Sequence, residues 1–139
     1  YGVLNYLHLF DMVLDFIDRD FIDKTEPKEG NRTVFFSPIS HPAHYDCKFL
    51  PIRYKNQFKN RLSTFEKELN LRNTSKEFNL DIIHKLTTVY KTSISENFNY
   101  KEMLTCKEYT DKLDIMRKET LKDVFTYFDS SDDFIRTTE

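Results

Sequence analysis

Residues 3–22 read VLNYLHLFDMVLDFIDRDFI, and this stretch decides the fold class. Its apolar side chains recur every three or four residues, as they do along one face of an amphipathic α-helix. The apolar face consists of Val3, Leu7, Phe10, Leu14, Ile17 and Phe21. The opposite side carries a polar stripe of His8, Asp11, Asp15 and Asp18. We therefore predict a helix over 3–22 with one buried side and one acidic side.

Three later segments show the same periodicity and predict helices over 52–70, 76–94 and 106–128. Capping-box patterns precede the last two, where a hydroxyl and a carboxylate satisfy the first amides of a helix. The positions expected to face the core in the last helix are Tyr109, Leu113, Met116, either Thr120 or Leu121, Val124 and Phe128. The polar tail 129–139 is expected to fray. The sequence thus predicts a single all-α domain of four helices.

The connections between these helices differ in length. Roughly 27 residues separate the first helix from the second, which is long for a compact domain. The second connection is short, and the third is long enough to return along a bundle. A long–short–long pattern permits the up-up-down-down four-helix bundle, with two long crossover loops. The β-prone run 33–36 and the irregular segment 95–105 favour a small two-stranded β-ribbon between those loops.

Composition excludes several function classes. The 139 residues include 13 Phe and 8 Tyr but only 2 Gly, and the net charge is −2. A chain without a global positive charge gives no electrostatic case for nucleic acid, and no apolar run reaches the roughly 18 residues of a membrane span. With so few glycines, a glycine-rich phosphate-binding loop is not possible.

Charge is unevenly distributed along the chain. The segment 48–61 contains five basic residues and no acid, whereas the helix over 3–22 is acidic. These two stretches either attract each other or meet charged partners. A sulfated glycan is the partner considered for the basic stretch, through Lys48, Lys55 and Lys59.

The cysteines and sequons bear on the compartment. Cys47 lies before the second helix and Cys106 opens the fourth, so a bond between them would tie the two long loops together. Asn31 and Asn73 begin N-glycosylation sequons in predicted loops. An even cysteine count with two sequons favours a secreted glycoprotein, and the alternative is a cytosolic protein with two buried thiols.

No catalytic or metal-binding motif emerges. His41, His44, Asp46 and Cys47 are possible zinc ligands within seven residues, but Pro42 prevents a regular helical presentation and clean pair spacing is lacking. A thiol nucleophile needs a free cysteine beside a base, which a bridged cysteine is not. We therefore expect no enzyme, no metal and no cofactor.

The order of these features resembles the short-chain four-helix cytokines, the group that includes granulocyte–macrophage colony-stimulating factor. The similar stretches are 46–49 leading into 53–58, Thr105-Cys106, and 117–125. The resemblance implies a Cys47–Cys106 disulfide. It also implies a receptor contact by an acidic residue in the middle of the first helix, which is either Asp11 or Asp15.

Three functions follow as hypotheses. The first is a secreted cytokine-like ligand that binds cell-surface receptors through His8, Asp11, Asp15 and Asp18 and through Arg117 of the fourth helix. The second is a non-enzymatic helical protein-interaction module, cytosolic or pathogen-derived, unrelated to cytokines. The third is a carrier whose aromatic core holds an apolar ligand.

Overall fold

The computed structural model describes residues 1–25 and 28–137, and within these ranges it contains helices and no strand. The all-α class is therefore confirmed. The β-ribbon predicted between 33–36 and 95–105 is wrong, because neither described segment forms a strand. The elements, in chain order, are α1 Leu9–Asp18, the 3-10 helices η1 Ala43–Tyr45 and η2 Cys47–Phe49, α2 Ile52–Asn70, α3 Lys76–Ser93, α4 Tyr100–Arg117, α5 Leu121–Val124 and the 3-10 helix η3 Ser131–Phe134.

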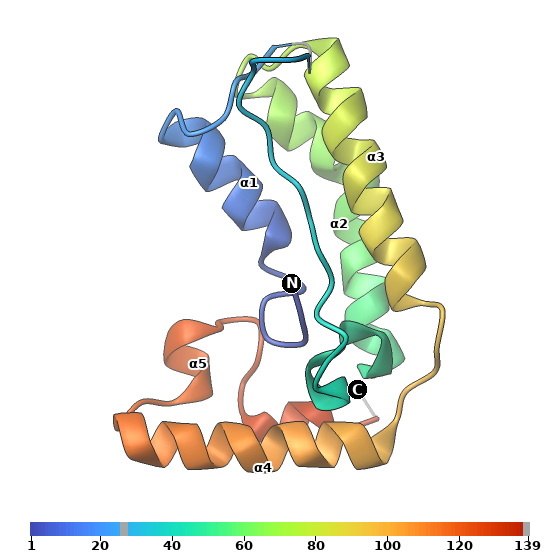
Figure 1. The fold of residues 1–139 in the computed structure, drawn as a ribbon, viewed down its shortest axis with the longest axis vertical. Coiled ribbons are helices and arrows are strands. Elements are labelled where there is room, and N and C mark those ends of the chain that lie inside the picture. The colour runs from blue at the N-terminus through green and yellow to red at the C-terminus, as the bar shows by residue number, and fades with distance from the viewer. Residues whose placement is uncertain (26–27, 138–139) are drawn as a thin grey trace.

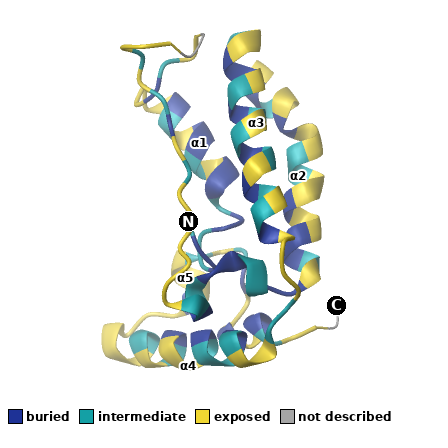
Figure 2. Cartoon of the chain, turned by 45° about the vertical axis from the view of Figure 1, so that its right-hand side comes forward, coloured by how far each residue is buried: buried dark blue, intermediate teal, exposed yellow. Residues whose placement is uncertain are grey.

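The two longest vertical helices, α2 and α3, form an antiparallel pair, and α1 lies beside them (Figure 1). The segment between α1 and η1 descends along the molecule (Figure 1). At its upper end the carbonyl of Lys24 accepts a hydrogen bond from the amide of Ser75 at 2.9 Å. At its lower end the carbonyl of Tyr45 accepts one from the amide of Val3, also at 2.9 Å. Helix α4 lies across the lower end of the α2–α3 pair (Figures 1 and 2). The predicted up-up-down-down topology is therefore not confirmed.

The first helix is shorter than predicted. Residues 3–8 form consecutive turns, and α1 begins at Leu9. It ends at Asp18, shortly before Asp20 adopts a φ of 57°, a left-handed conformation that aspartate tolerates better than most residues. Val3 and Tyr6 are nevertheless fully buried. The apolar spacing of 3–22 thus predicted the burial of Val3 and Tyr6 correctly, but residues 3–8 form turns and not a helix.

The prediction of one helix over 106–128 is wrong at both ends. Helix α4 begins at Tyr100, where the Asn99 side chain accepts a hydrogen bond from the amide of Glu102 at 3.1 Å. Cys106 therefore lies inside the helix and does not open it. The helix stops at Arg117 because Lys118 takes a φ of 54°, and Thr120 and Asp123 then form a capping box that begins α5.

The tail does not fray over the residues that are described. Phe134 is fully buried in η3, and its ring lies 4.9 Å from that of Phe128. The Arg53 side chain donates a 2.8 Å hydrogen bond to the carbonyl of Asp133. Residues 138–139, the end of the predicted frayed segment, lie outside the described residues. The described tail is part of the core.

The core is built mainly from aromatic rings that face inward from α1, α2 and the N-terminal turn, as the buried positions in Figure 2 indicate. The rings of Tyr6 and Phe58 stack at 4.5 Å, and Phe10 contacts both Phe58 and Phe65 at 4.6 and 5.0 Å. Aromatic pairs in such geometries stabilise a core beyond their buried area. In the described residues, no helix has the length and apolarity needed to cross a membrane.

The disulfide implied by the cytokine resemblance is absent. Cys47 in η2 and Cys106 in α4 are both buried, and both are free thiols. Burial raises the pKa of each thiol to about 12, so neither is ionised at neutral pH. Because the thiolate is the reactive form, both cysteines behave here as small apolar core residues.

The thiols provide a first test. In the native, unreduced protein, we expect both cysteines to react slowly with Ellman's reagent, because they are buried and protonated. After unfolding in guanidinium without reductant, two thiols per chain should react at once. Fewer than two reactive thiols in the unfolded, unreduced protein would show that the disulfide forms after all.

The tail provides a second test. Phe134→Ala should lower the free energy of unfolding by about 3–5 kcal/mol, since it removes a fully buried ring. Phe35→Ala is the matched control: Phe35 is 77% exposed, and its loss should cost less than about 1 kcal/mol. Denaturant titration measures both values. Equal small losses would mean that the tail is not part of the folded core.

Candidate functional site: the α4–α5 corner

The acidic stripe predicted to meet a receptor is paired within the chain itself. Asp11 lies 2.8 Å from Arg61 of α2. Asp18 lies 2.8 Å from Arg72, which follows α2. Asp15 pairs with Arg19 at 2.9 Å on the exposed side of α1. Part of the basic stretch therefore serves as the partner of the acidic helix, as the charge pattern allowed.

Arg61 is the centre of this network. Its guanidinium also bonds Glu68 at 3.1 Å and donates to the Tyr127 hydroxyl at 2.8 Å, and Tyr127 in turn donates to Asp11 at 2.6 Å. Burial raises the pKa of the Asp11 carboxyl, but the hydrogen bonds from Arg61 and Tyr127 outweigh burial and hold it below 3.8. Asp11 is thus an ionised structural residue that ties α1 to α2 and to Tyr127, which follows α5.

His8 is a packing residue in the same region. Its ring lies edge-on to Tyr127 at 4.6 Å and to Phe125 at 5.8 Å. Its buried Nε2 atom has no hydrogen-bond partner among the described residues. Burial lowers the pKa of His8, and the Asp11 carboxylate only partly offsets this. A neutral ring enclosed by two aromatic rings is poorly placed to contact a receptor.

The three lysines predicted to bind a sulfated glycan do not form one surface. Lys55 is only 2% exposed and points into the protein, so the predicted glycan contact through Lys55 is wrong. Lys48 is partly buried and lies 3.5 Å from the Asp46 carboxylate. Lys59 is exposed. Of the three lysines predicted to bind a sulfated glycan, only Lys59 is exposed.

The loop with four possible zinc ligands is occupied by packing and capping contacts. His44 is buried, with its ring stacked on Tyr109 of α4 at 4.9 Å. Asp46 caps η2 by accepting a hydrogen bond from the amide of Lys48 at 3.1 Å. Cys47 is buried behind it. Among the described residues, no three His, Cys, Asp or Glu side chains gather as metal ligands.

Several exposed large apolar side chains lie where α4 turns into α5. We call this surface the α4–α5 corner and define it by Leu113, Ile115, Met116, Arg117, Lys118 and Val124. Ile115 is 79% exposed, Met116 77% and Val124 52%. Figure 1 shows the end of α4 reaching away from α2 and α3, with α5 folded back above it. The corner thus presents large apolar side chains to solvent at one end of the molecule.

Local chemistry builds this corner. Helix α4 is held to the body by its first half, through the buried side chains of Met103, Cys106 and Thr110. Beyond Thr110 no residue of α4 is fully buried. The left-handed conformation of Lys118 ends the helix, and the Asp114 carboxylate accepts a hydrogen bond from the amide of Leu121 at 3.1 Å, which fixes α5 against α4. A shallow groove of about 130 Å³ follows the junction.

Cations and carboxylates both lie at the corner, among them the exposed Glu119 next to Lys118. Arg117 and Lys118 are exposed, and neither forms an ion pair with any described residue. Two neighbouring carboxylates are engaged with backbone amides instead: Asp114 with Leu121, and Asp123 with Thr120 at 3.3 Å. The cations therefore remain available to an acidic partner beside the exposed Ile115 and Met116 side chains.

Sequence reasoning found only Arg117 of this surface. It assigned Met116 and Val124 to the core side of a continuous helix, and both are exposed. The missed signal was the Thr120–Asp123 spacing, a capping-box pattern that begins a new helix. Of the other predicted site residues, Asn73 is exposed and Asn31 partly buried, and their glycosylation stays a prediction.

The Asp11 network makes stability depend on pH. Because the folded-state pKa of Asp11 is below 3.8, its carboxylate stabilises the fold above that pH, and the stabilisation is lost as pH falls through 3.8 and then through the folded pKa. Asp11→Asn should therefore lower the unfolding free energy at about pH 6 and have a smaller effect near pH 3. Asp15→Asn, in an exposed pair, is the control and should have little effect at either pH. A penalty for Asp11→Asn that does not change with pH would contradict this role.

No protein-family model, curated protein or solved structure matches this chain. The cytokine resemblance and the functions that it implies therefore stay predictions.

Proposed function

We propose that this chain is a non-enzymatic helical protein-interaction module, and that its α4–α5 corner binds an acidic amphipathic segment of a partner protein. One observation carries the proposal: Ile115 and Met116 are nearly fully exposed beside Arg117 and Lys118, which have no ion-pair partner in the described chain. The proposal assigns these four side chains the role of contact residues.

Exposed apolar side chains in a cluster favour an interface. Burial of apolar surface contributes about 25 cal/mol per Å², and this chain leaves Ile115, Met116 and Val124 largely outside its own core. Methionine is a flexible side chain that adapts to varied partner surfaces. A helix that lays its apolar face along a groove is a common way to cover such side chains. The groove at the α4–α5 junction is lined by Leu113, Arg117 and Val124, and Ile115 and Met116 lie outside its lining.

The charge of the corner selects the sign of the partner. Asp114 and Asp123 accept hydrogen bonds from backbone amides, and Arg117 and Lys118 form no ion pair with any described residue. Complementary charge speeds encounter and excludes partners of the same sign. A segment that combines acidic and apolar residues therefore fits this surface better than a neutral or basic one.

The secreted receptor ligand has less support. That hypothesis depended on a disulfide and on an acidic stripe free to meet a receptor. Cys47 and Cys106 are free thiols, and Asp11 and Asp18 pair with Arg61 and Arg72. Buried free thiols are typical of a reducing compartment, which supports the module. The same compartment would leave the sequons at Asn31 and Asn73 unmodified.

The test uses a designed probe because the natural partner is unidentified. A synthetic helical peptide with leucines on one face and glutamates on the other is titrated into the protein, and backbone amide shifts are followed by NMR. We expect the shifts to cluster between residues 112 and 125. The double variant Arg117→Glu/Lys118→Glu should weaken binding about tenfold or more, since each reversed charge costs roughly 1 kcal/mol.

Two controls make the test specific. The double variant Lys59→Glu/Lys91→Glu reverses the same charge at exposed positions on α2 and α3 and should leave the affinity unchanged. A peptide in which lysines replace the glutamates should bind much more weakly than the acidic one. Shifts spread over other faces, or equal affinities for both double variants, would exclude the α4–α5 corner as the binding surface.

A further inference from the structure

A buried lysine lies at the base of a second pocket, far from the α4–α5 corner in the sequence. Lys55 of α2 is 2% exposed, although lysine is among the residues least often buried. Its ammonium donates to the carbonyl oxygens of Lys48 at 2.6 Å and Glu96 at 2.9 Å. These two bonds join η2, α2 and the segment after α3. They use two of the three donors of the ammonium group.

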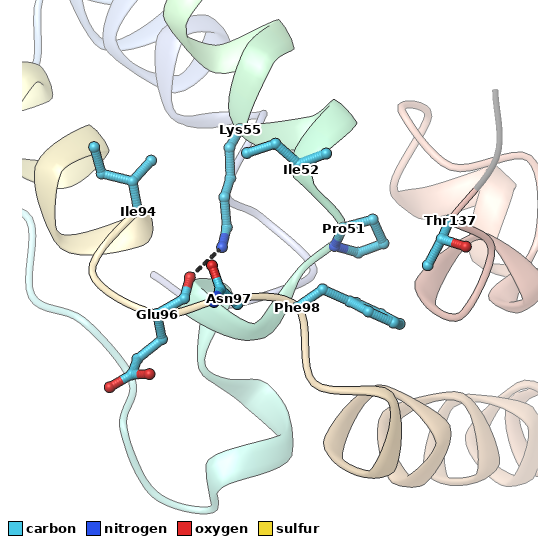
Figure 3. Close-up of a pocket in the computed structure, with 8 residues that line it drawn as sticks. All are labelled: Pro51, Ile52, Lys55, Ile94, Glu96, Asn97, Phe98 and Thr137. Atoms are coloured by element: carbon cyan, nitrogen blue, oxygen red, sulfur yellow. Dashed lines mark hydrogen bonds between the residues drawn. The ribbon is translucent and has the colours of Figure 1, made fainter.

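The charge of Lys55 is not neutralised by the surrounding chain. Among the described residues, no carboxylate forms an ion pair with its Nζ atom; Asp46 pairs with Lys48 instead. Glu96 offers Lys55 its carbonyl, while its carboxylate points away from the pocket (Figure 3). A buried charge without a counter-ion is costly, and such charges are usually paired. Within residues 1–25 and 28–137, the Asp46 and Glu96 carboxylates favour the charge of Lys55 without forming an ion pair with its ammonium.

A pocket of about 290 Å³ adjoins Lys55. Its apolar lining comes from the start of α2 and the segment after α3, with Pro51, Ile52, Ile94 and Phe98, and its polar lining consists of Lys55, Glu96, Asn97 and Thr137. Figure 3 shows Lys55 extending between Ile94 on one side and Pro51 and Phe98 on the other, toward Glu96 and Asn97. A single buried cation within an apolar enclosure is the pattern of a site that fixes one charged group of a ligand and covers its hydrocarbon part.

We infer that this pocket binds a small monocarboxylate with an apolar body, whose carboxylate accepts a hydrogen bond from the Lys55 ammonium while its hydrocarbon chain packs on Ile52, Ile94 and Phe98. One negative charge matches the single cation at the base of the pocket. The apolar walls disfavour strongly hydrated anions such as sulfate. Such an anion would lose its hydration shell on entering the pocket without enough polar contacts to offset the desolvation free energy.

Electrostatics in the free protein agree with this assignment. Burial lowers the pKa of Lys55, while Cys47, Asp46 and Glu96 oppose the change. A bound carboxylate would favour the charged ammonium and raise the pKa again. A bound carboxylate would therefore stabilise the charged form of Lys55, which burial destabilises.

Hexanoate is the probe that tests the site. Its carboxylate and five further carbons fit within a pocket of about 290 Å³. We expect a dissociation constant of about 0.1–1 mM by NMR titration, typical of a ligand with few heavy atoms. Shifts should be confined to residues 51–55 and 94–98, and hexanol, which lacks the charge, should bind at least about tenfold more weakly.

Two variants assign the binding to the pocket. Lys55→Met keeps the length of the side chain but removes its charge, and should weaken hexanoate binding at least about tenfold. Lys59→Met is the matched control one turn further along α2, where the lysine is exposed, and should have no effect. Ile52→Trp fills the pocket from a side chain that is 61% exposed and should abolish binding while the melting temperature is kept.

The outcomes separate this inference from the function proposed above. The Arg117→Glu/Lys118→Glu variant should bind hexanoate as the unmodified protein does, whatever its effect on peptide binding. If Lys55→Met fails to fold, the Ile52→Trp variant decides the result. Absence of hexanoate binding, equal binding of hexanol, or binding that survives Ile52→Trp would each overturn the proposed carboxylate site.

Discussion

The whole structure depends on one aromatic cluster that buries Phe58. Tyr6 stacks on Phe58 from the N-terminal turn, Phe10 contacts it from α1, and Tyr90 lies parallel to it from α3. A buried phenol needs a hydrogen-bond partner, and Tyr6 finds one in Ser93 of α3 at 2.7 Å. These contacts join the N-terminal turn, α1, α2 and α3 into one core. Helix α4 is not part of the cluster and is attached through η1, η2 and η3, so its second half is free to extend into solvent.

Charge in this chain is used largely for internal contacts. The acidic side of α1 and the basic residues of α2 look in the sequence like two surfaces for two partners, yet Arg61 and Arg72 bind Asp11 and Asp18 directly. These ion pairs are partly exposed, and each contributes little alone. Linked through Tyr127, however, the Arg61 network connects α1, α2 and the segment after α5. Charged residues that form no ion pair with the described chain, such as Arg117 and Lys118, are therefore better candidates for partner contacts than the basic segment 48–61.

The sequence predicted the helical class, the extent of α2 and most of α3, because long periodic segments with clear caps identify themselves. The predicted start of the first helix was wrong because buried residues need not be helical: Val3 and Tyr6 are buried but lie in turns. The predicted end of the fourth helix was also wrong, because the helix ends before Lys118 and neither a glycine nor a proline marks that end in the sequence. The site was missed for the same reason, since a continuous helix would have placed Met116 and Val124 in the core. The inward direction of Lys55 had no sequence signal, because lysines on helices usually project outward.

Both proposed sites lie where the chain departs from an ordinary local preference. Three described residues other than glycine have positive φ, and two of them, Asp20 and Asn73, are types that tolerate it. Lys118 is not, and a left-handed conformation costs such a residue about 1 kcal/mol or more. Lys55 likewise bears the cost of a buried charge with neutral acceptors only. Natural sequences agree with their folds at most positions, and departures concentrate at functional sites. A helix break that exposes Ile115 and Met116, and a buried ammonium beside an apolar pocket, are departures that binding a partner or a ligand would offset.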